Sequence, residues 1–219
     1  GMAAQVSSMG YGFDYRLSMG VPDYWIKLVK DTPDEAWDMG ALMHELSQHR
    51  PEEMVISYCE SHDQALVGDK TLIFRMLDAD MYTGMTKSFH NLNIDRGIAL
   101  HKMIRLLTFS TSGGGYLNFM GNEFGHPEWI DFPREGNNWS YKYARRQWSL
   151  SKNNDLKYQF LGEFDREMLM LERNGTLLNE RHINRLIENT FDKVIAFTRG
   201  DYLFIFNFHP ANSYTDYGI

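Results

Sequence analysis

Cysteine is almost missing from this sequence, which holds only Cys59 among its 219 residues. A single cysteine excludes an intrachain disulfide and fits a reducing compartment, so we expect a cytoplasmic protein. No Cys/His spacing typical of a metal site occurs, and we expect neither a metal nor a cofactor. We expect Cys59 to be a small buried hydrophobic residue and not a nucleophile.

Long apolar runs and clusters of basic residues are missing as well. Without a run of about 18 apolar residues, we expect no membrane span. The first five residues lack the basic and apolar pattern of a signal peptide. Net charge is -7 with no Lys/Arg cluster, which argues against a nucleic-acid partner. Hydrophobic residues make up 43% and charged residues 23%, as expected for a globular protein with a real core.

Short strand-like and longer helix-like segments alternate along most of the chain. Apolar or alternating runs predict strands near residues 13–17, 54–58 and 116–119, and helical spacing predicts helices at 22–29, 41–46, 72–81, 95–109 and 156–171. We expect the helix at 95–109 to be strongly amphipathic. This order predicts an α/β fold with parallel strands and helical crossovers. Three strands are too few for a closed barrel, so the pattern by itself favours an open sheet.

The pattern changes from about Asn179 onward. Two apolar runs, Val194–Phe197 and Tyr202–Phe206, flank a Gly200-Asp201 pair. This arrangement predicts a β-hairpin. The tail therefore indicates the beginning of a separate β-domain.

Two abruptly polar segments follow predicted strands. Glu60-Ser61-His62-Asp63 comes after the second strand, and residues 121–126 follow the third. In parallel α/β folds, active residues lie at the carboxyl ends of strands. A carboxylate beside a histidine at such an end could bind sugar hydroxyls or act as a base. On these residues alone, a loop turn or a helix cap remains the simpler interpretation.

The longer motifs around these residues carry a specific resemblance. The chain resembles eukaryotic-type glycogen and starch branching enzymes of the alpha-amylase superfamily, and the similarity covers nearly all of it. The wider superfamily shares only the Glu-x-His-Asp pattern of Glu60–Asp63. The matching segments are residues 12–17, 58–70, 95–105, 115–129, 141–147 and 204–210.

The resemblance implies an architecture. Residues 1–178 would form the C-terminal portion of a (β/α)8 TIM barrel, with strands six to eight and their helices. Residues 179–219 would begin the C-terminal β-sandwich domain. Strands six and eight would then have unpaired edges, which favour self-association.

The resemblance also implies a chemistry. Such enzymes cleave alpha-1,4 glucan chains of glycogen, starch or amylose and transfer the piece to a 6-hydroxyl, with retention of configuration. The nucleophile Asp and the acid/base Glu would lie outside this chain. The third catalytic carboxylate maps onto Asp63, which would hold hydroxyls of the sugar, and His62 would donate to the same sugar.

Other polar residues have weaker assignments. Asp14 precedes Arg16, the reverse of the order in the nucleophile motif, so we do not assign it as the nucleophile. His101 and Arg105 share one helix face and are expected to be structural residues of an outer helix. We expect the glucan groove to be lined by Glu60, Asn122, Glu123, His126 and Trp129. For the last four of these residues, simple loop packing is the alternative.

Three functions follow from these motifs. The first is a segment of a glucan branching enzyme, which we expect to be inactive in isolation. The second is a non-catalytic, truncated glucan-binding or scaffold protein. The third is another alpha-amylase superfamily hydrolase, which the length of the match argues against.

Overall fold

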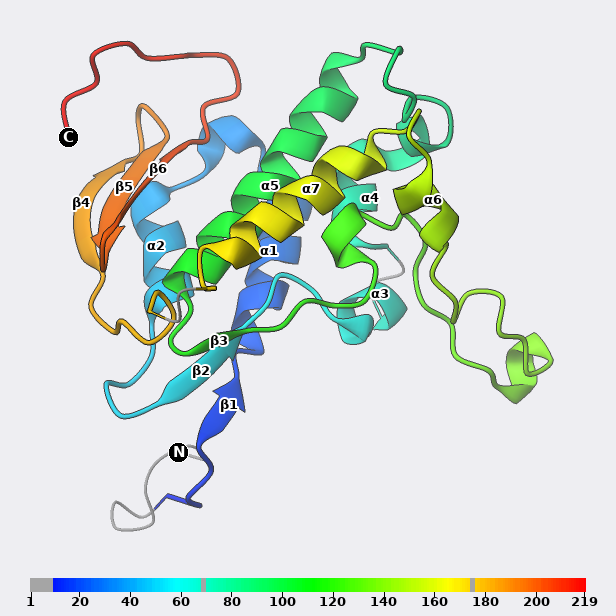
Figure 1. The fold of residues 1–219 in the computed structure, drawn as a ribbon, viewed down its shortest axis with the longest axis horizontal. Helices are drawn as coiled ribbons and strands as arrows, with labels where there is room; N and C mark the ends of the chain where they lie inside the picture. The colour runs from blue at the N-terminus through cyan, green and yellow to red at the C-terminus, as the bar shows by residue number, and fades with distance from the viewer. Residues whose placement is uncertain (1–9, 68–69, 174–175) are drawn as a thin grey trace. The chain divides into compact units, whose positions relative to one another are not determined.

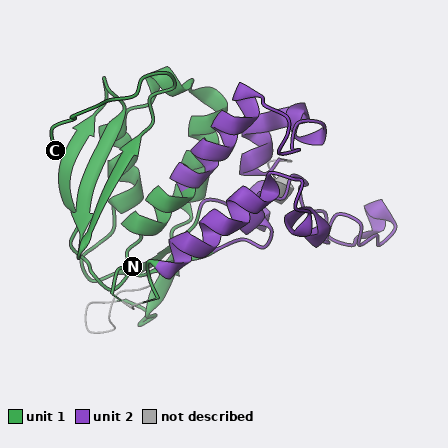
Figure 2. Ribbon diagram, turned by 45° about the horizontal axis from the view of Figure 1, so that its top comes forward, with its two compact units in different colours: residues 1–58, 105–117, 171–219 green, residues 59–104, 118–170 purple. Residues whose placement is uncertain are grey.

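A computed structural model describes residues 10–67, 70–173 and 176–219. The chain folds into two compact units, neither of which is continuous in sequence (Figure 2). Helix α5 (Leu92–Thr111) runs from one unit into the other.

Unit 1 comprises residues 1–58, 105–117 and 171–219, and unit 2 comprises residues 59–104 and 118–170. This division differs from the predicted boundary between residues 178 and 179. A division by contacts does not test where a domain begins in the sequence, so the domain boundary between residues 178 and 179 stays a prediction.

A three-stranded parallel sheet in unit 1 contains the predicted strands. Strand β2 (Met54–Ser57) lies between β1 (Tyr15–Leu17) and β3 (Gly115–Tyr116) and is parallel to both (Figure 1). The prediction of parallel strands is confirmed. Strand β3 is shorter than the predicted run at 116–119.

The two predicted helices between β1 and β2 are present. Helix α1 (Gly20–Asp31) has Pro22 in its first turn, where the missing N–H costs nothing. Its Trp25 is fully buried and donates through Nε1 to Thr108 Oγ1 at 2.9 Å. A 3-10 turn, η2 (Asp34–Ala36), then leads to α2 (Met39–Ser47).

A second, antiparallel sheet in unit 1 contains the predicted hairpin. Strands β5 (Val194–Arg199) and β6 (Tyr202–Asn207) pair across the turn, where Gly200 has a φ of 55°. That conformation suits glycine. An additional strand, β4 (Asn184–Asn189), pairs with the other edge of β5 and was not predicted.

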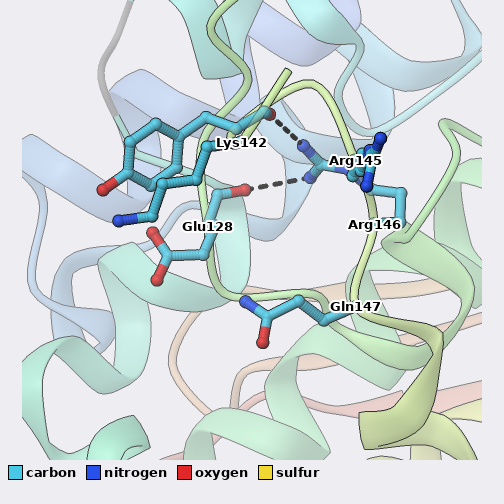
Figure 3. A pocket seen from close by; sticks show the side chains of 6 residues that line it. Glu128, Lys142, Arg145, Arg146 and Gln147 are labelled. Atoms are coloured by element: carbon cyan, nitrogen blue, oxygen red, sulfur yellow. Dashed lines mark hydrogen bonds between the residues drawn. The ribbon is translucent and has the colours of Figure 1, made fainter. Parts of the chain in front are cut away.

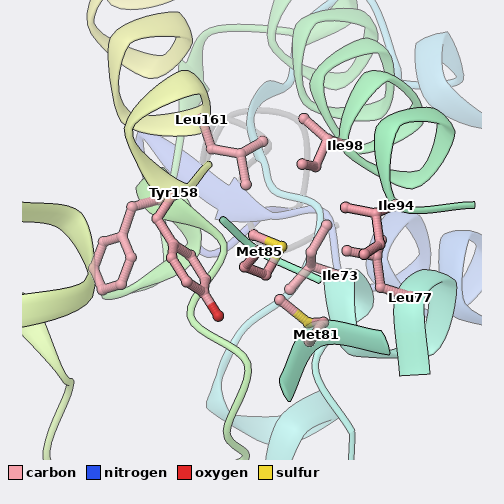
Figure 4. Packing of buried hydrophobic residues seen from close by; sticks show 9 residues of the cluster. Ile73, Leu77, Met81, Met85, Ile94, Ile98, Tyr158 and Leu161 are labelled. Atoms are coloured by element: carbon pink, nitrogen blue, oxygen red, sulfur yellow. The ribbon is translucent and has the colours of Figure 1, made fainter. Parts of the chain in front are cut away.

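Unit 2 consists of helices and loops around an apolar core (Figure 4). After α3 (His62–Val67), the predicted helix at 72–81 divides into α4 (Leu72–Leu77) and the 3-10 segment η3 (Asp78–Tyr82). The remaining elements are η4 (Asn122–Phe124), η5 (Glu135–Asn137), α6 (Trp148–Lys152) and α7 (Tyr158–Met170). The core cluster comprises Ile73, Leu77, Met81, Met85, Ile94, Ile98, Phe124, Tyr158 and Leu161.

The prediction that the helix at 95–109 is strongly amphipathic is wrong. Its polar residues do not form an exposed stripe, because His101, Arg105, Thr108 and Ser110 are all fully buried. His101 Nε2 lies 2.9 Å from the Oδ1 atom of Asn122. A structural role for His101 agrees with this contact, whereas its complete burial was not predicted. Within the described ranges, no helix combines the length and apolarity required to cross a membrane.

Candidate functional site

Glu60 has a structural contact at the start of the first polar segment. Its side chain is buried, and Oε2 accepts a hydrogen bond from the backbone N–H of Leu72 at 2.7 Å. Leu72 begins α4, so the carboxylate satisfies one of the free N–H groups at that helix terminus. This contact explains why a carboxylate stands at position 60 without any bound substrate. The groove-lining role of Glu60 stays a prediction.

His62 and Asp63 are the exposed members of this segment. Their side chains are 53% and 56% exposed, and His62 Nε2 lies 3.1 Å from Asp63 Oδ1. The His62 ring meets Phe132 edge-on, with the ring centroids 5.9 Å apart. Asp63 is fixed through its backbone, whose N–H donates to Ser61 Oγ at 3.2 Å. Both side chains can therefore reach a ligand from solvent while the backbone holds their positions.

The second polar segment forms a tight turn with internal hydrogen bonds. Gly121 has a φ of 101°, and its N–H donates to Glu123 Oε2 at 2.7 Å. Asn122 is buried and contacts His101. These contacts agree with loop packing, and no contact tests whether Asn122 or Glu123 also meets a glucan.

His126 is buried next to Arg146. Its Nδ1 lies 3.0 Å from Arg146 Nη1 and 3.2 Å from the N–H of Glu128. A guanidinium can only donate, so Nδ1 accepts and the ring hydrogen is on Nε2. Burial, followed by the charge of Arg146, lowers the pKa of His126 from 6.5 to about 4. His126 is therefore neutral near pH 7 and serves as an acceptor within the loop.

Arg146 organises this loop and was not predicted as a site residue. It is buried, and its guanidinium donates to the backbone carbonyls of Glu128 and Tyr143 at 3.0 Å (Figure 3). It also donates to the backbone carbonyl of Trp129 at 3.2 Å. A Cβ atom at Gly121 would lie 2.8 Å from Arg146 Cδ, so this turn needs a glycine. The only hint in the sequence was the Arg145-Arg146 pair, and arginine pairs are usually exposed.

Trp129 is the most exposed of the predicted groove residues that follow β3. It stacks on Tyr143 with the ring centroids 4.6 Å apart and the planes 22° from parallel, yet 37% of its surface remains open. The structure thus links His126 and Trp129 through Arg146, and it pairs His62 with Asp63. In the ranges given above, no three His, Cys, Asp or Glu residues are grouped to hold a metal ion.

The fold and these residues define a class of protein. The model of the alpha amylase C-terminal all-beta domain matches residues 187–219, which include β5 and β6. The antiparallel sheet is therefore of the alpha-amylase type. Three parallel strands precede the matched residues in the chain, so helices, a parallel sheet and an antiparallel sheet of this type occur together.

Curated relatives match nearly the whole chain. A 1,4-alpha-glucan-branching enzyme of Debaryomyces hansenii is 59% identical over 211 residues, covering 96% of this chain and 30% of the relative. The Saccharomyces cerevisiae enzyme is 56% identical with the same coverage, and the Felis catus enzyme is 54% identical over the whole chain and 31% of its own length. Over 96% or more of its length the chain is therefore similar to 1,4-alpha-glucan-branching enzymes. It spans about 30% of the length of these relatives.

Proposed function

We propose that this chain supplies part of the glucan site of a 1,4-alpha-glucan-branching enzyme, which forms alpha-1,6 branches from alpha-1,4 chains. The observation that carries the proposal is the position of Glu60–Asp63 directly after β2, the central strand of a parallel sheet. Active residues gather at such strand ends. The high identity to enzymes named for this reaction supports the same chemistry here.

The three parallel strands suit a place in a larger barrel. In the proposed enzyme, β1, β2 and β3 are strands six, seven and eight of a (β/α)8 barrel. The carboxylate nucleophile and the acid/base carboxyl then belong to strands four and five, outside this chain. Asp63, after strand seven, is the third carboxylate of the site.

Asp63 and His62 act on the sugar next to the bond that is cut. Retention of configuration requires two displacements through an oxocarbenium-like transition state. The Asp63 carboxylate accepts hydrogen bonds from hydroxyls of that sugar, and His62 donates to the same ring. Hydrogen bonds that strengthen as the ring distorts stabilise the transition state more than the bound substrate. They therefore lower the energy barrier of the reaction and raise kcat more than they lower KM.

The isolated chain is expected to be inactive. Without a nucleophile and an acid/base it can hold a glucan but cannot exchange a glycosidic bond. Addition of amylose to the purified chain should therefore give no new alpha-1,6 linkages by proton NMR. We also propose a cytoplasmic location, on the basis of the single buried cysteine.

A chimera tests the proposed function. The matching segment of the S. cerevisiae relative, which is 56% identical, is replaced by this chain, and branching of amylose is followed by NMR. We expect an active chimera in which Asp63→Asn lowers kcat by about a hundredfold or more, corresponding to about 3 kcal/mol of transition-state stabilisation.

Asp14→Asn serves as the matched control, since Asp14 is an exposed carboxylate that immediately precedes β1. This variant should retain the activity of the chimera. An Asp63→Asn chimera that branches amylose as fast as the unsubstituted one would contradict the proposal.

A further inference from the structure

A pocket in unit 2 is lined by none of the residues with a predicted site role, although two of its lining residues, Arg146 and Tyr143, contact His126 and Trp129. It has a volume of about 530 Å³ and is lined by Glu128, Lys142, Tyr143, Arg145, Arg146 and Gln147 (Figure 3). This volume lies within the usual range for small-molecule sites. We propose that the pocket binds hexose units of an alpha-glucan chain, as a holding site for the substrate. The choice of ligand rests on the proposed function.

The wall of the pocket is fixed in advance by Arg146. Its guanidinium bonds to three backbone carbonyls, two of them from the pocket residues Glu128 and Tyr143. It also donates to His126. These bonds hold both sides of the pocket, residue 128 and residues 142–147, at one spacing. Arg146 is therefore a positioning residue, and a ligand meets a preformed wall that costs little to order.

The side chains around the pocket suit a neutral polyol. Lys142 offers donors, the Glu128 carboxylate offers acceptors, and the Gln147 amide and Tyr143 hydroxyl offer both. Sugar hydroxyls donate and accept in equal measure, so this mixture can satisfy a hexose. The Trp129 ring stacked on Tyr143 keeps the phenol in place.

The lining carries three cations, Lys142, Arg145 and Arg146, against the one carboxylate of Glu128, so an anion is the competing ligand. Glu128 places a carboxylate in the wall, which repels phosphate. The Nη1 and Nη2 groups of Arg146 are already bonded to carbonyls and to His126. Lys142 and Arg145 remain, and both are exposed to water. We therefore commit to a glucan and treat inorganic phosphate as the competing outcome.

The test uses the 219-residue chain labelled with 15N and titrated with maltoheptaose. The side-chain amide of Gln147 and the indole N–H of Trp129 are the site-specific NMR signals. We expect both to shift with one Kd. Tyr143→Phe and Glu128→Gln should each raise this Kd by about three- to tenfold, since each removes part of the hydrogen bonding to the sugar. Tyr143→Phe retains the stack on Trp129, so its fold should be unchanged.

Two controls match these variants. Tyr141→Phe removes a hydroxyl from an exposed tyrosine outside the pocket lining, and Asp63→Asn alters the proposed catalytic carboxylate. Neither should change the Kd read at Gln147. An equal Kd in the wild-type chain and in both pocket variants overturns the proposal. Shifts of the Gln147 signal with inorganic phosphate but not with maltoheptaose overturn it as well.

The pocket titration and the chimera assay can fail independently of each other. A branching-competent chimera combined with no maltoheptaose shift at Gln147 refutes the pocket alone. An inactive chimera combined with a maltoheptaose Kd that depends on Tyr143 and Glu128 refutes the branching proposal and supports the pocket.

Discussion

Arg146 donates through Nη1 to Nδ1 of His126 over 3.0 Å, between two side chains that are both buried. The same guanidinium bonds to three part-buried carbonyls, so a side chain without its planar, two-pronged donor group leaves several of these acceptors without a partner. We expect Arg146→Lys to lower the free energy of unfolding by about 2–4 kcal/mol, because a lysine reaches fewer of these acceptors.

Urea denaturation measures this loss. The adjacent Arg145 is exposed and provides a matched control within the same loop. Arg145→Lys should change the free energy of unfolding by less than about 0.5 kcal/mol. Equal stability of the two variants would show that the buried hydrogen bonds of Arg146 contribute nothing.

The depressed pKa of His126 predicts a pH dependence of stability. The folded-state pKa is about 4, below the ordinary value of 6.5, so between these values the unfolded chain binds more protons than the folded chain. The stabilising contribution is complete above about pH 6.5 and is lost as the pH falls toward 4. The slope reaches at most about 1.4 kcal/mol per pH unit.

Comparison with His126→Asn isolates this contribution from that of the carboxylates. Asparagine supplies Oδ1 close to the Nδ1 position and does not titrate. The difference in unfolding free energy between wild type and His126→Asn should change between pH 6.5 and 4 and stay constant above pH 7. A difference that is independent of pH over the whole range would contradict a buried, neutral His126.

Glu60 leads to a prediction that separates stability from catalysis. Its carboxylate bonds to the N–H of Leu72 at the start of α4, as a capping side chain does. Glu60→Ala should therefore cost about 1–2 kcal/mol in thermal or urea unfolding. Asp63→Asn is the control, because its side chain is 56% exposed and its loss should cost less than about 0.5 kcal/mol. The reverse order of the two effects would contradict the capping role.

Regular patterns in the sequence were sufficient to predict most of the elements. The hairpin was predicted because two β-prone runs flank Gly200, and the parallel strands because apolar runs alternate with helical spacing. Strand β4 was missed because Asn184–Asn189 is polar at both ends and lies at a sheet edge. The end of α4 was missed because Asp78, and not a glycine, adopts the positive φ there.

Local sequence patterns were also insufficient to predict the contacts of the candidate site. His62 and Asp63 were assigned through the resemblance, because Glu60–Asp63 matches the family motif after a strand, and this assignment stays a prediction. Arg146 was not found because its importance depends on carbonyls of residues up to 18 positions away, which no local pattern encodes. The sequence also gave no sign that Glu60 bonds to Leu72, 12 residues later.

The exposed edge of the parallel sheet predicts self-association of the isolated chain. Among the described residues, β1 pairs only with β2, and its Tyr15 and Leu17 are 49% and 47% exposed. A strand with one unpaired edge and exposed Tyr and Leu side chains is a template for a second chain. We expect oligomers whose mass rises with concentration in light scattering. The double variant Tyr15→Lys/Leu17→Lys should shift the chain toward monomer, whereas Phe191→Ser, which removes an exposed ring from a turn, should not. A monodisperse wild-type monomer at all concentrations would contradict association through this edge.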